Sequence, residues 1–213
     1  MSSTGSRQAG AILWLLSIQY YVVQLVVASA WSDANPYSWA QNTISDLANT
    51  TCGPYGDRLV CSPLHPLMNA SFLLLGITMI LGSWLLAKSA SATAVKLGLL
   101  CMALAGIGTI LVGLFPENSI AAMHVLGATL AFVLGNVGML LIGIGSNHTP
   151  KMLRYLTIAA AVLGLAALAA FVLQAYGSLG IGGLERVVAY PQSIWMIATG
   201  LYLLIRKRTD HGL

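Results

Sequence analysis

Six long hydrophobic runs alternate with shorter polar segments along this chain. Each run is about as long as the roughly 20 apolar residues that a helix needs to cross a hydrocarbon core roughly 30 Å thick. Ala28-Ser29-Ala30 also fits a signal-peptidase site, but the preceding run is long for a signal peptide, which favours a retained helix. The pattern predicts an all-α, six-helix transmembrane bundle in a single domain, 1–213. The runs cover about residues 11–30, 67–87, 97–115, 120–145, 155–176 and 187–205.

The composition agrees with a lipid environment. Hydrophobic residues make up 57% of the chain and charged residues 8%, against roughly a quarter charged in soluble domains. A net charge of +4 would suggest a nucleic-acid partner in a soluble protein. Here the basic residues flank the hydrophobic runs, which indicates membrane topology. We therefore expect membrane lipids, and no nucleic acid, as partners.

The distribution of charge predicts the orientation of the bundle. Eight basic residues fall on one side of the six spans, and only Arg58 and Arg186 fall on the other. Because positive charge is retained in the cytoplasm, both termini should be cytoplasmic and the loop 32–66 extracytoplasmic. The eight residues are Arg7, Lys88, Lys96, Lys151, Arg154, Arg206, Lys207 and Arg208.

Two of the three cysteines, Cys52 and Cys61, lie in the outer loop. An oxidising compartment allows a disulfide to persist there, although two unpaired thiols remain an alternative. Closing so short a loop should stabilise the fold by roughly 2 to 3 kcal/mol. Cys101 lies within a hydrophobic run and is expected to be a small core residue.

The fourth run carries small residues at a helical spacing of four, at Gly127, Ala131 and Gly135. Such a stripe lets a neighbouring helix approach closely. His124 lies one turn before the stripe and should therefore point into the bundle. Asn136 is expected to form hydrogen bonds between helices.

Polar residues concentrate at the predicted outer ends of the helices. If the bundle is compact, these side chains should line one pocket at the outer face. They are Asn42, Ser45, Asp46, His65, Asn69, Glu117, Asn118, His124, Glu185, Arg186, Tyr190 and Gln192.

One hypothesis for this pocket is a metal centre. His65 and His124 would supply imidazoles, and Asp46, Glu117 or Glu185 would supply a carboxylate, leaving one coordination position for water. Zinc is the metal that such a set suggests. The alternative is two hydrogen-bonded histidines, since no H-x-x-x-H or H-E-x-x-H spacing is present.

A second hypothesis is metal-free catalysis by Asp46, His65, His124 or Glu185, with Ser45 as a nucleophile and Arg186 holding an anion. The structural alternative is that Ser45 and Asp46 cap a short helix or that Asp46 pairs with Arg58 or Arg186. Glu185 and Arg186 are each expected to pair with an arginine or aspartate from the first loop.

A third hypothesis is ligand binding without catalysis. Aromatic residues near the interface would rim the pocket, which suits a lipid headgroup or another lipid-like small molecule. Transport is disfavoured because the middle of the spans lacks acidic, basic and histidine residues. The aromatic residues are Tyr37, Trp39, Tyr55 and Tyr190.

Several motifs lie along the chain: Tyr37-Ser38, N-T-I-S-D-L at 42–47, S-P-L-H at 62–65, Asn69, G-L-F-P-E-N at 113–118, His124 and G-L-E-R at 183–186. Together these motifs resemble the bacterial and archaeal membrane family called domain of unknown function 998. The resemblance covers essentially the whole chain and implies a six-helix protein of the prokaryotic plasma membrane, with no assigned reaction. The chain is more distantly similar to the damage-regulated autophagy modulator group, whose outer loops have a comparable F-P…H element.

The sequence thus favours a membrane protein that binds a lipid-like ligand or a partner in an outer polar pocket. The alternative is a membrane-embedded hydrolase or transferase that uses Ser45, Asp46, His65, His124 and Glu185 in the same pocket. Neither a cofactor nor an oligomeric state follows from the residues.

Overall fold

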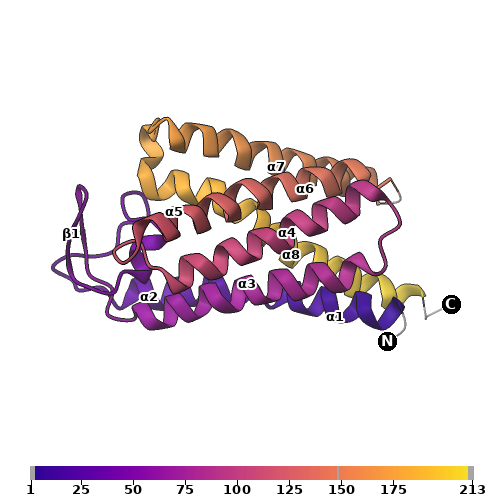
Figure 1. Ribbon diagram of the computed structural model, residues 1–213, viewed down its shortest axis with the longest axis horizontal. Coiled ribbons are helices and arrows are strands. Elements are labelled where there is room, and N and C mark those ends of the chain that lie inside the picture. Colours follow the sequence, from indigo (N-terminus) through magenta and orange to yellow (C-terminus); the bar gives the residue numbers. More distant parts are fainter. Residues whose placement is uncertain (1–2, 148, 211–213) are drawn as a thin grey trace.

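Six helices of the computed structural model, which describes residues 3–147 and 149–210, are long and apolar enough to cross a membrane. They lie side by side in one bundle, with the first span formed by α1 and α2 and the fourth by α5, η2 and α6 (Figure 1). The predicted all-α, six-helix bundle is confirmed. The elements are α1 (Ser3–Leu15), α2 (Ile18–Ser29), η1 (Ser45–Ala48), β1 (Gly53–Tyr55), β2 (Arg58–Val60), α3 (His65–Ala87), α4 (Thr93–Leu114), α5 (Ala121–Thr129), η2 (Leu130–Leu134), α6 (Gly135–Gly145), α7 (Lys151–Val172), η3 (Gly177–Leu179) and α8 (Gly180–Asp210).

The predicted helix boundaries need correction where polar residues begin or end a helix. The last helix begins at Gly180, well before residue 187, so Glu185 and Arg186 lie in its first turns. Gly180 has a φ of 71°, which glycine adopts without strain, and it turns the chain from η3 into α8. Hydropathy detects the apolar part of a helix and misses polar turns beyond it. For the same reason other helices begin earlier, at Ser3, His65, Thr93 and Lys151. The end of α7 differs in the opposite sense: it lies at Val172 instead of Tyr176, and Gln174 just beyond it has a non-helical φ of 56°.

Glycines let the central helices pack backbone against backbone. A Cβ atom on Gly76 of α3 would lie 2.5 Å from the carbonyl oxygen of Gly106 in α4. A Cβ atom on Gly108 of α4 would likewise lie 2.5 Å from the carbonyl oxygen of Gly127 in α5. Both distances are too short for a larger residue, so these glycines set how closely the helices approach. The predicted role of Gly127 is confirmed.

The fourth span contains a π-helical turn, η2, and this turn is linked to α8 by Asn136. The side-chain nitrogen of Asn136 donates to the carbonyl oxygens of Phe132 at 2.8 Å and Val188 at 3.1 Å. The residue is fully buried and joins two helices, as predicted. Turns of this kind are frequent at functional sites, which directs attention to the neighbouring side chains.

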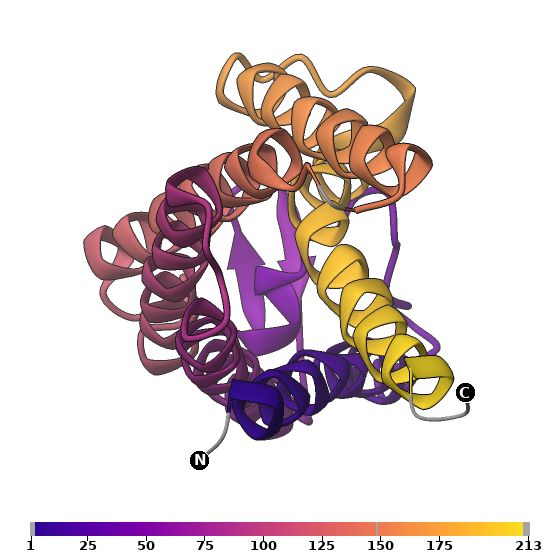
Figure 2. The same cartoon turned by 90° about the vertical axis from the view of Figure 1, so that its right-hand side faces the viewer.

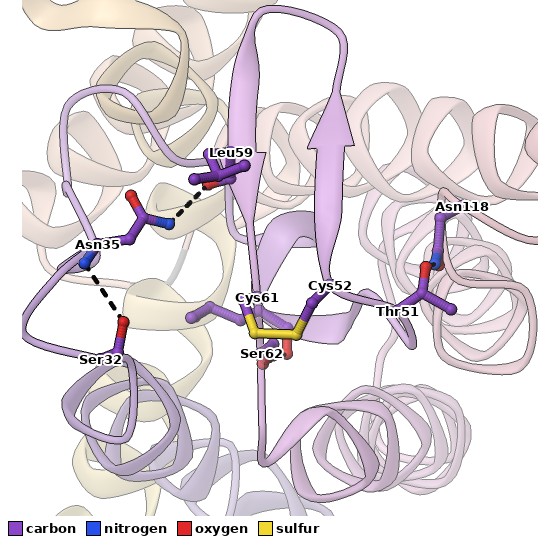
Figure 3. The surroundings of a disulfide bond; sticks show 9 residues. Ser32, Asn35, Thr51, Cys52, Leu59, Cys61, Ser62 and Asn118 are labelled. Carbon is purple, nitrogen blue, oxygen red and sulfur yellow. Dashed lines mark hydrogen bonds between the residues drawn. A yellow bond between two sulfur atoms is a disulfide. The ribbon is translucent and has the colours of Figure 1, made fainter.

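The outer loop forms a lid over one end of the bundle (Figure 1). Its strands β1 and β2 pair antiparallel, with Gly53 opposite Val60 and Tyr55 opposite Arg58. Cys52 and Cys61 form a disulfide at the base of this hairpin, which confirms the predicted bond (Figure 3). The disulfide therefore closes the hairpin covalently at the base of its two strands.

The opposite end of the bundle carries the first turn of α1, the last turns of α8 and the connections that follow α3 and α6 (Figure 1). Most of the basic residues lie at this end, which we call the basic end. The charge rule predicts that the basic end lies in the cytoplasm and the lid outside it.

Candidate functional site

Asp46 lies at the centre of the polar residues under the lid and is fully buried. Arg58 grips its carboxylate with two hydrogen bonds, Nε to Oδ2 at 2.8 Å and Nη2 to Oδ1 at 3.0 Å. Asn42 and the backbone N–H of Thr43 also donate to Oδ2, each at 3.0 Å. Burial opposes ionisation, but the hydrogen bonds and the positive charge of Arg58, together with hydrogen bonds from Glu117 and Asn42, outweigh it and lower the pKa of Asp46. Asp46 is therefore an ionised anchor for the lid.

Glu117, from the turn between α4 and α5, is a second acid beside the same arginine. Its Oε1 accepts a hydrogen bond from Asn49 at 2.9 Å and lies 3.9 Å from Nη2 of Arg58. Burial and the neighbouring Asp46 carboxylate raise the pKa of Glu117 to about 9. Arg58 lies beside both carboxyl groups and its single positive charge pairs with Asp46. Asp46 is therefore negatively charged, and Glu117 is protonated at neutral pH.

Three elements meet at Ser45 of η1. Its Oγ lies 3.1 Å from Nε2 of His124 in α5 and 3.3 Å from Oε1 of Glu185 in α8. Nδ1 of His124 lies 2.9 Å from the carbonyl oxygen of Phe115. A carbonyl oxygen only accepts, so Nδ1 carries the hydrogen and Nε2 is left as an acceptor. The other oxygen of Glu185 accepts from the backbone N–H of Ile44. The Ser45 hydroxyl thus faces two acceptors.

Arg186 is buried beside this group, and backbone carbonyls surround it. Its Nη1 donates to the carbonyl oxygens of Trp39 and Asn42, each at 2.9 Å, and to that of Gly182 at 2.7 Å. Its Nη2 donates to the hydroxyl of Tyr37, and its guanidinium lies 4.8 Å from the Trp39 ring centroid. Neither ion pair in the described part of the chain includes Arg186.

The expectation that Glu185 and Arg186 pair with charged residues of the first loop is therefore wrong. The early start of α8 brings both side chains against the backbone of the lid, and backbone groups serve as their partners. Asp46 instead pairs with Arg58, one of the two arginines considered for it.

A cavity of about 40 Å³ lies below Ser45 and Glu185, inside the bundle. Gln192 of α8 also lines it, is 6% exposed and has no hydrogen-bond partner on Oε1. A water needs about 10 to 15 Å³ of such volume, so the cavity admits a few small groups or the end of a chain. Most of its wall is apolar, formed among others by Phe72, Leu75, Met79, Val112, Phe132 and Met196.

The structure brings most of the predicted site residues together under the lid. Two neighbouring groups, with Arg58 added, are together called the polar cluster. Hydrogen bonds link Ser45, His124 and Glu185 in one group. Hydrogen bonds and the ion pair of Arg58 with Glu117 link the other, which consists of Asn42, Asp46, Arg58, Glu117 and Arg186. Three other predicted residues form hydrogen bonds outside the polar cluster. Asn69 donates to the carbonyl oxygen of Ala48, Asn118 donates to the hydroxyls of Thr50 and Thr51, and Tyr190 donates to Oε1 of Gln24.

His65 does not join the polar cluster. It opens α3, and its buried Nδ1 has no hydrogen-bond partner. Within residues 3–147 and 149–210, no group of three or more His, Cys, Asp or Glu is placed to hold a metal ion. The ligand set predicted for zinc, with His65 and His124 as its imidazoles, is therefore not assembled.

Sequence reasoning missed several partners of the polar cluster. The hydroxyl of Tyr37 donates to the carbonyl oxygen of Thr43 at 2.7 Å, so this residue is part of the interior and not only of an aromatic rim. Burial raises the pKa of Tyr37. The carbonyl of Phe115, which orients His124, is a backbone group that no residue pattern could reveal.

A family model described as "Protein of unknown function (DUF998)" matches residues 17–202, which include the whole polar cluster. No curated protein and no solved structure matches the chain.

Proposed function

The chain belongs to the DUF998 family of multi-pass membrane proteins of unknown function, and we propose from its site that it binds an amphipathic ligand under the lid. The ligand's polar end would meet Ser45, Glu185 and Gln192, and only the part of its chain next to that end would lie against the apolar wall of the cavity. The observation that carries this proposal is the buried Oε1 of Gln192, which lacks a partner. An unsatisfied buried acceptor costs roughly 1 to 3 kcal/mol, which a ligand donor would recover.

The chemistry of the cavity specifies the kind of ligand. Oε1 of Gln192 and the carboxyl oxygens of Glu185 accept hydrogen bonds, so the ligand's polar end should be a donor such as a hydroxyl or an amide N–H. A narrow cavity with few polar groups also suits a single chain better than a ring system.

A pair of matched probes tests this proposal in lipid nanodiscs. Dodecanol has a hydroxyl donor, and dodecyl methyl ether has the same chain without it. At a hundredfold excess over its dissociation constant, dodecanol should raise the melting temperature by about 5 to 10 °C. The ether should have little effect. The substitution Gln192→Leu should abolish the difference between the probes, whereas the exposed Gln41→Leu should preserve it. Equal stabilisation by both probes would refute the proposal.

The hydrogen bond between Ser45 and His124 favours a second candidate, an acyl hydrolase or transferase. The serine oxygen would attack an ester carbonyl while its proton moves to Nε2 of His124, which then protonates the departing alcohol. Water or an acceptor alcohol would release the acyl group from Ser45. Phe115 would hold the imidazole through Nδ1.

A fluorophosphonate probe distinguishes the candidates, because it modifies only an activated serine. Labelling of the wild type that is lost in Ser45→Ala and in His124→Ala would support catalysis. Labelling of neither the wild type nor the variants would leave ligand binding as the function of the site.

We also place the protein in a prokaryotic plasma membrane with its lid outside the cytoplasm. The support is the Cys52–Cys61 disulfide, which an oxidising compartment maintains, together with the family resemblance.

A further inference from the structure

A second and much larger cavity opens at the basic end of the bundle. Its volume is about 820 Å³, within the roughly 300 to 1,000 Å³ typical of small-molecule sites. It is bordered by α1, α3, α4, α6, α7 and α8, and Figure 2 looks along the bundle from this end. This cavity is separate from the small one beneath the lid. The inference drawn from it does not depend on ligand binding under the lid, but it rests on the proposed orientation with the basic end in the cytoplasm.

The walls of the large cavity are apolar along most of its length. Its lining follows α8 from Arg186 to Leu203, a stretch of roughly 25 Å at about 1.5 Å per residue. Leu156 of α7 and Ile194 of α8 belong to the lining and are 57% and 53% exposed. An apolar chain could therefore enter sideways between these helices, as lipid acyl chains do.

Three arginines and no acidic residue line the large cavity. Arg7 and Arg154 lie towards the basic end, and Arg154 is held there by hydrogen bonds to the carbonyl oxygens of Gly143 at 3.0 Å and Ile144 at 3.1 Å. Arg186 lies at the far end, is 7% exposed and has no hydrogen-bond partner on Nε. An apolar space with only positive charges attracts a negatively charged amphiphile.

Hydroxyl donors lie beside the basic residues. Ser89, Ser146 and Thr149 line the cavity near Arg7 and Arg154, in the connections that follow α3 and α6. Hydroxyls and guanidinium groups together match the oxygens of a phosphate. Basic pockets between membrane helices on the cytoplasmic side are suited to phospholipid headgroups.

We propose that the large cavity binds one anionic phospholipid from the inner leaflet. Its phosphate contacts Arg7 and Arg154, and one acyl chain lies along α8 between Leu156 and Ile194. The headgroup supplies the negative charge that the lining lacks, and the acyl chain fills the apolar volume.

Native mass spectrometry of the purified full-length chain tests this proposal with phosphatidylglycerol and phosphatidylcholine of identical acyl chains. Two arginines near a phosphate correspond to a preference of about thirtyfold for phosphatidylglycerol, bound at one molecule per chain. The double substitution Arg7→Gln with Arg154→Gln should remove this preference. The matched control, Lys96→Gln with Lys151→Gln, removes two exposed charges outside the cavity and should retain it.

A second variant tests the cavity volume alone. It leaves both arginines unchanged, which matters because Arg154 also binds carbonyl oxygens of α6. Ala160 of α7 lines the cavity, and Ala160→Phe should fill part of it while leaving both arginines in place. Binding of phosphatidylglycerol should fall at least tenfold in this variant, with its melting temperature measured to show that it is folded. No preference in the wild type, unchanged binding in Ala160→Phe, or an equal loss in the lysine control would each overturn the proposal.

Discussion

At the scale of single residues, Glu117 should control how the stability of the lid depends on pH. Its pKa is raised to about 9 in the folded protein, above the usual value of 4.5, so folding favours its protonated form. This contribution is complete below about pH 4.5 and is lost as pH rises towards 9. Between pH 5 and 9 the melting temperature of the wild type should therefore fall. The substitution Glu117→Gln keeps an acceptor for Asn49 and should reduce that fall by several degrees.

Asp46 serves as the control, because its pKa is shifted in the opposite direction to that of Glu117. The pKa of Asp46 is lowered, so its contribution is present at neutral pH and is lost only as pH falls below its usual value of 3.8. Asp46→Asn should lower the melting temperature throughout pH 5 to 9. Parallel curves for the wild type and Glu117→Gln would show that Glu117 does not titrate as described.

Sequence patterns predicted which polar residues gather but not what each one binds. Topology alone placed Asn42, Ser45, His124 and Glu185 at the same end of the bundle. The partners depend on helix starts and on backbone groups, which hydropathy does not report. Glu185 accepts from the N–H of Ile44, and His124 is oriented by a carbonyl, so neither contact has a signature in side-chain types.

At the scale of secondary-structure elements, the hairpin depends on its disulfide. The loop between Cys52 and Cys61 is short, with a sequence separation of 9, and its closure should stabilise the fold by about 2 to 3 kcal/mol. The double substitution Cys52→Ser with Cys61→Ser should lower stability by that amount. Cys101→Ser serves as the control, because that thiol forms no disulfide. A membrane-impermeant maleimide should label the two lid cysteines of intact cells only after reduction, and labelling without reductant would contradict the bond.

The close packing of α3 against α4 depends on glycines in both helices. A Cβ on Gly106 would lie 2.7 Å from the carbonyl oxygen of Gly76, so Gly106→Leu should force the helices apart and cost several kcal/mol. Leu104→Phe changes a side chain of the same helix that is 39% exposed, and it should be nearly neutral. Thermal unfolding in detergent measures both. Equal melting temperatures would show that the helices tolerate a wider separation.

Helix number and type were predictable because a hydrocarbon core requires a minimum apolar length for each span. The break between α1 and α2, the π-helical turn η2 and the early start of α8 were not predictable in this way. The π-helical turn is linked to α8 by the hydrogen bond from Asn136 to Val188, and such a tertiary contact leaves little trace in the local pattern. The early start of α8 follows the turn at Gly180 and includes Glu185 and Arg186, which hydropathy does not detect.

At the scale of the whole molecule, charge asymmetry and the two cavities make orientation a testable property. The lid end buries the polar cluster, whereas the basic end opens the large cavity towards Arg7 and Arg154. If both termini are cytoplasmic, a C-terminal green fluorescent protein should fluoresce, and a C-terminal alkaline phosphatase should be inactive in bacterial cells. Phosphatase fused after Asp57 in the hairpin should instead be active. The reverse result would invert the topology and would place the large cavity in the outer leaflet, where an anionic inner-leaflet lipid could not reach Arg154.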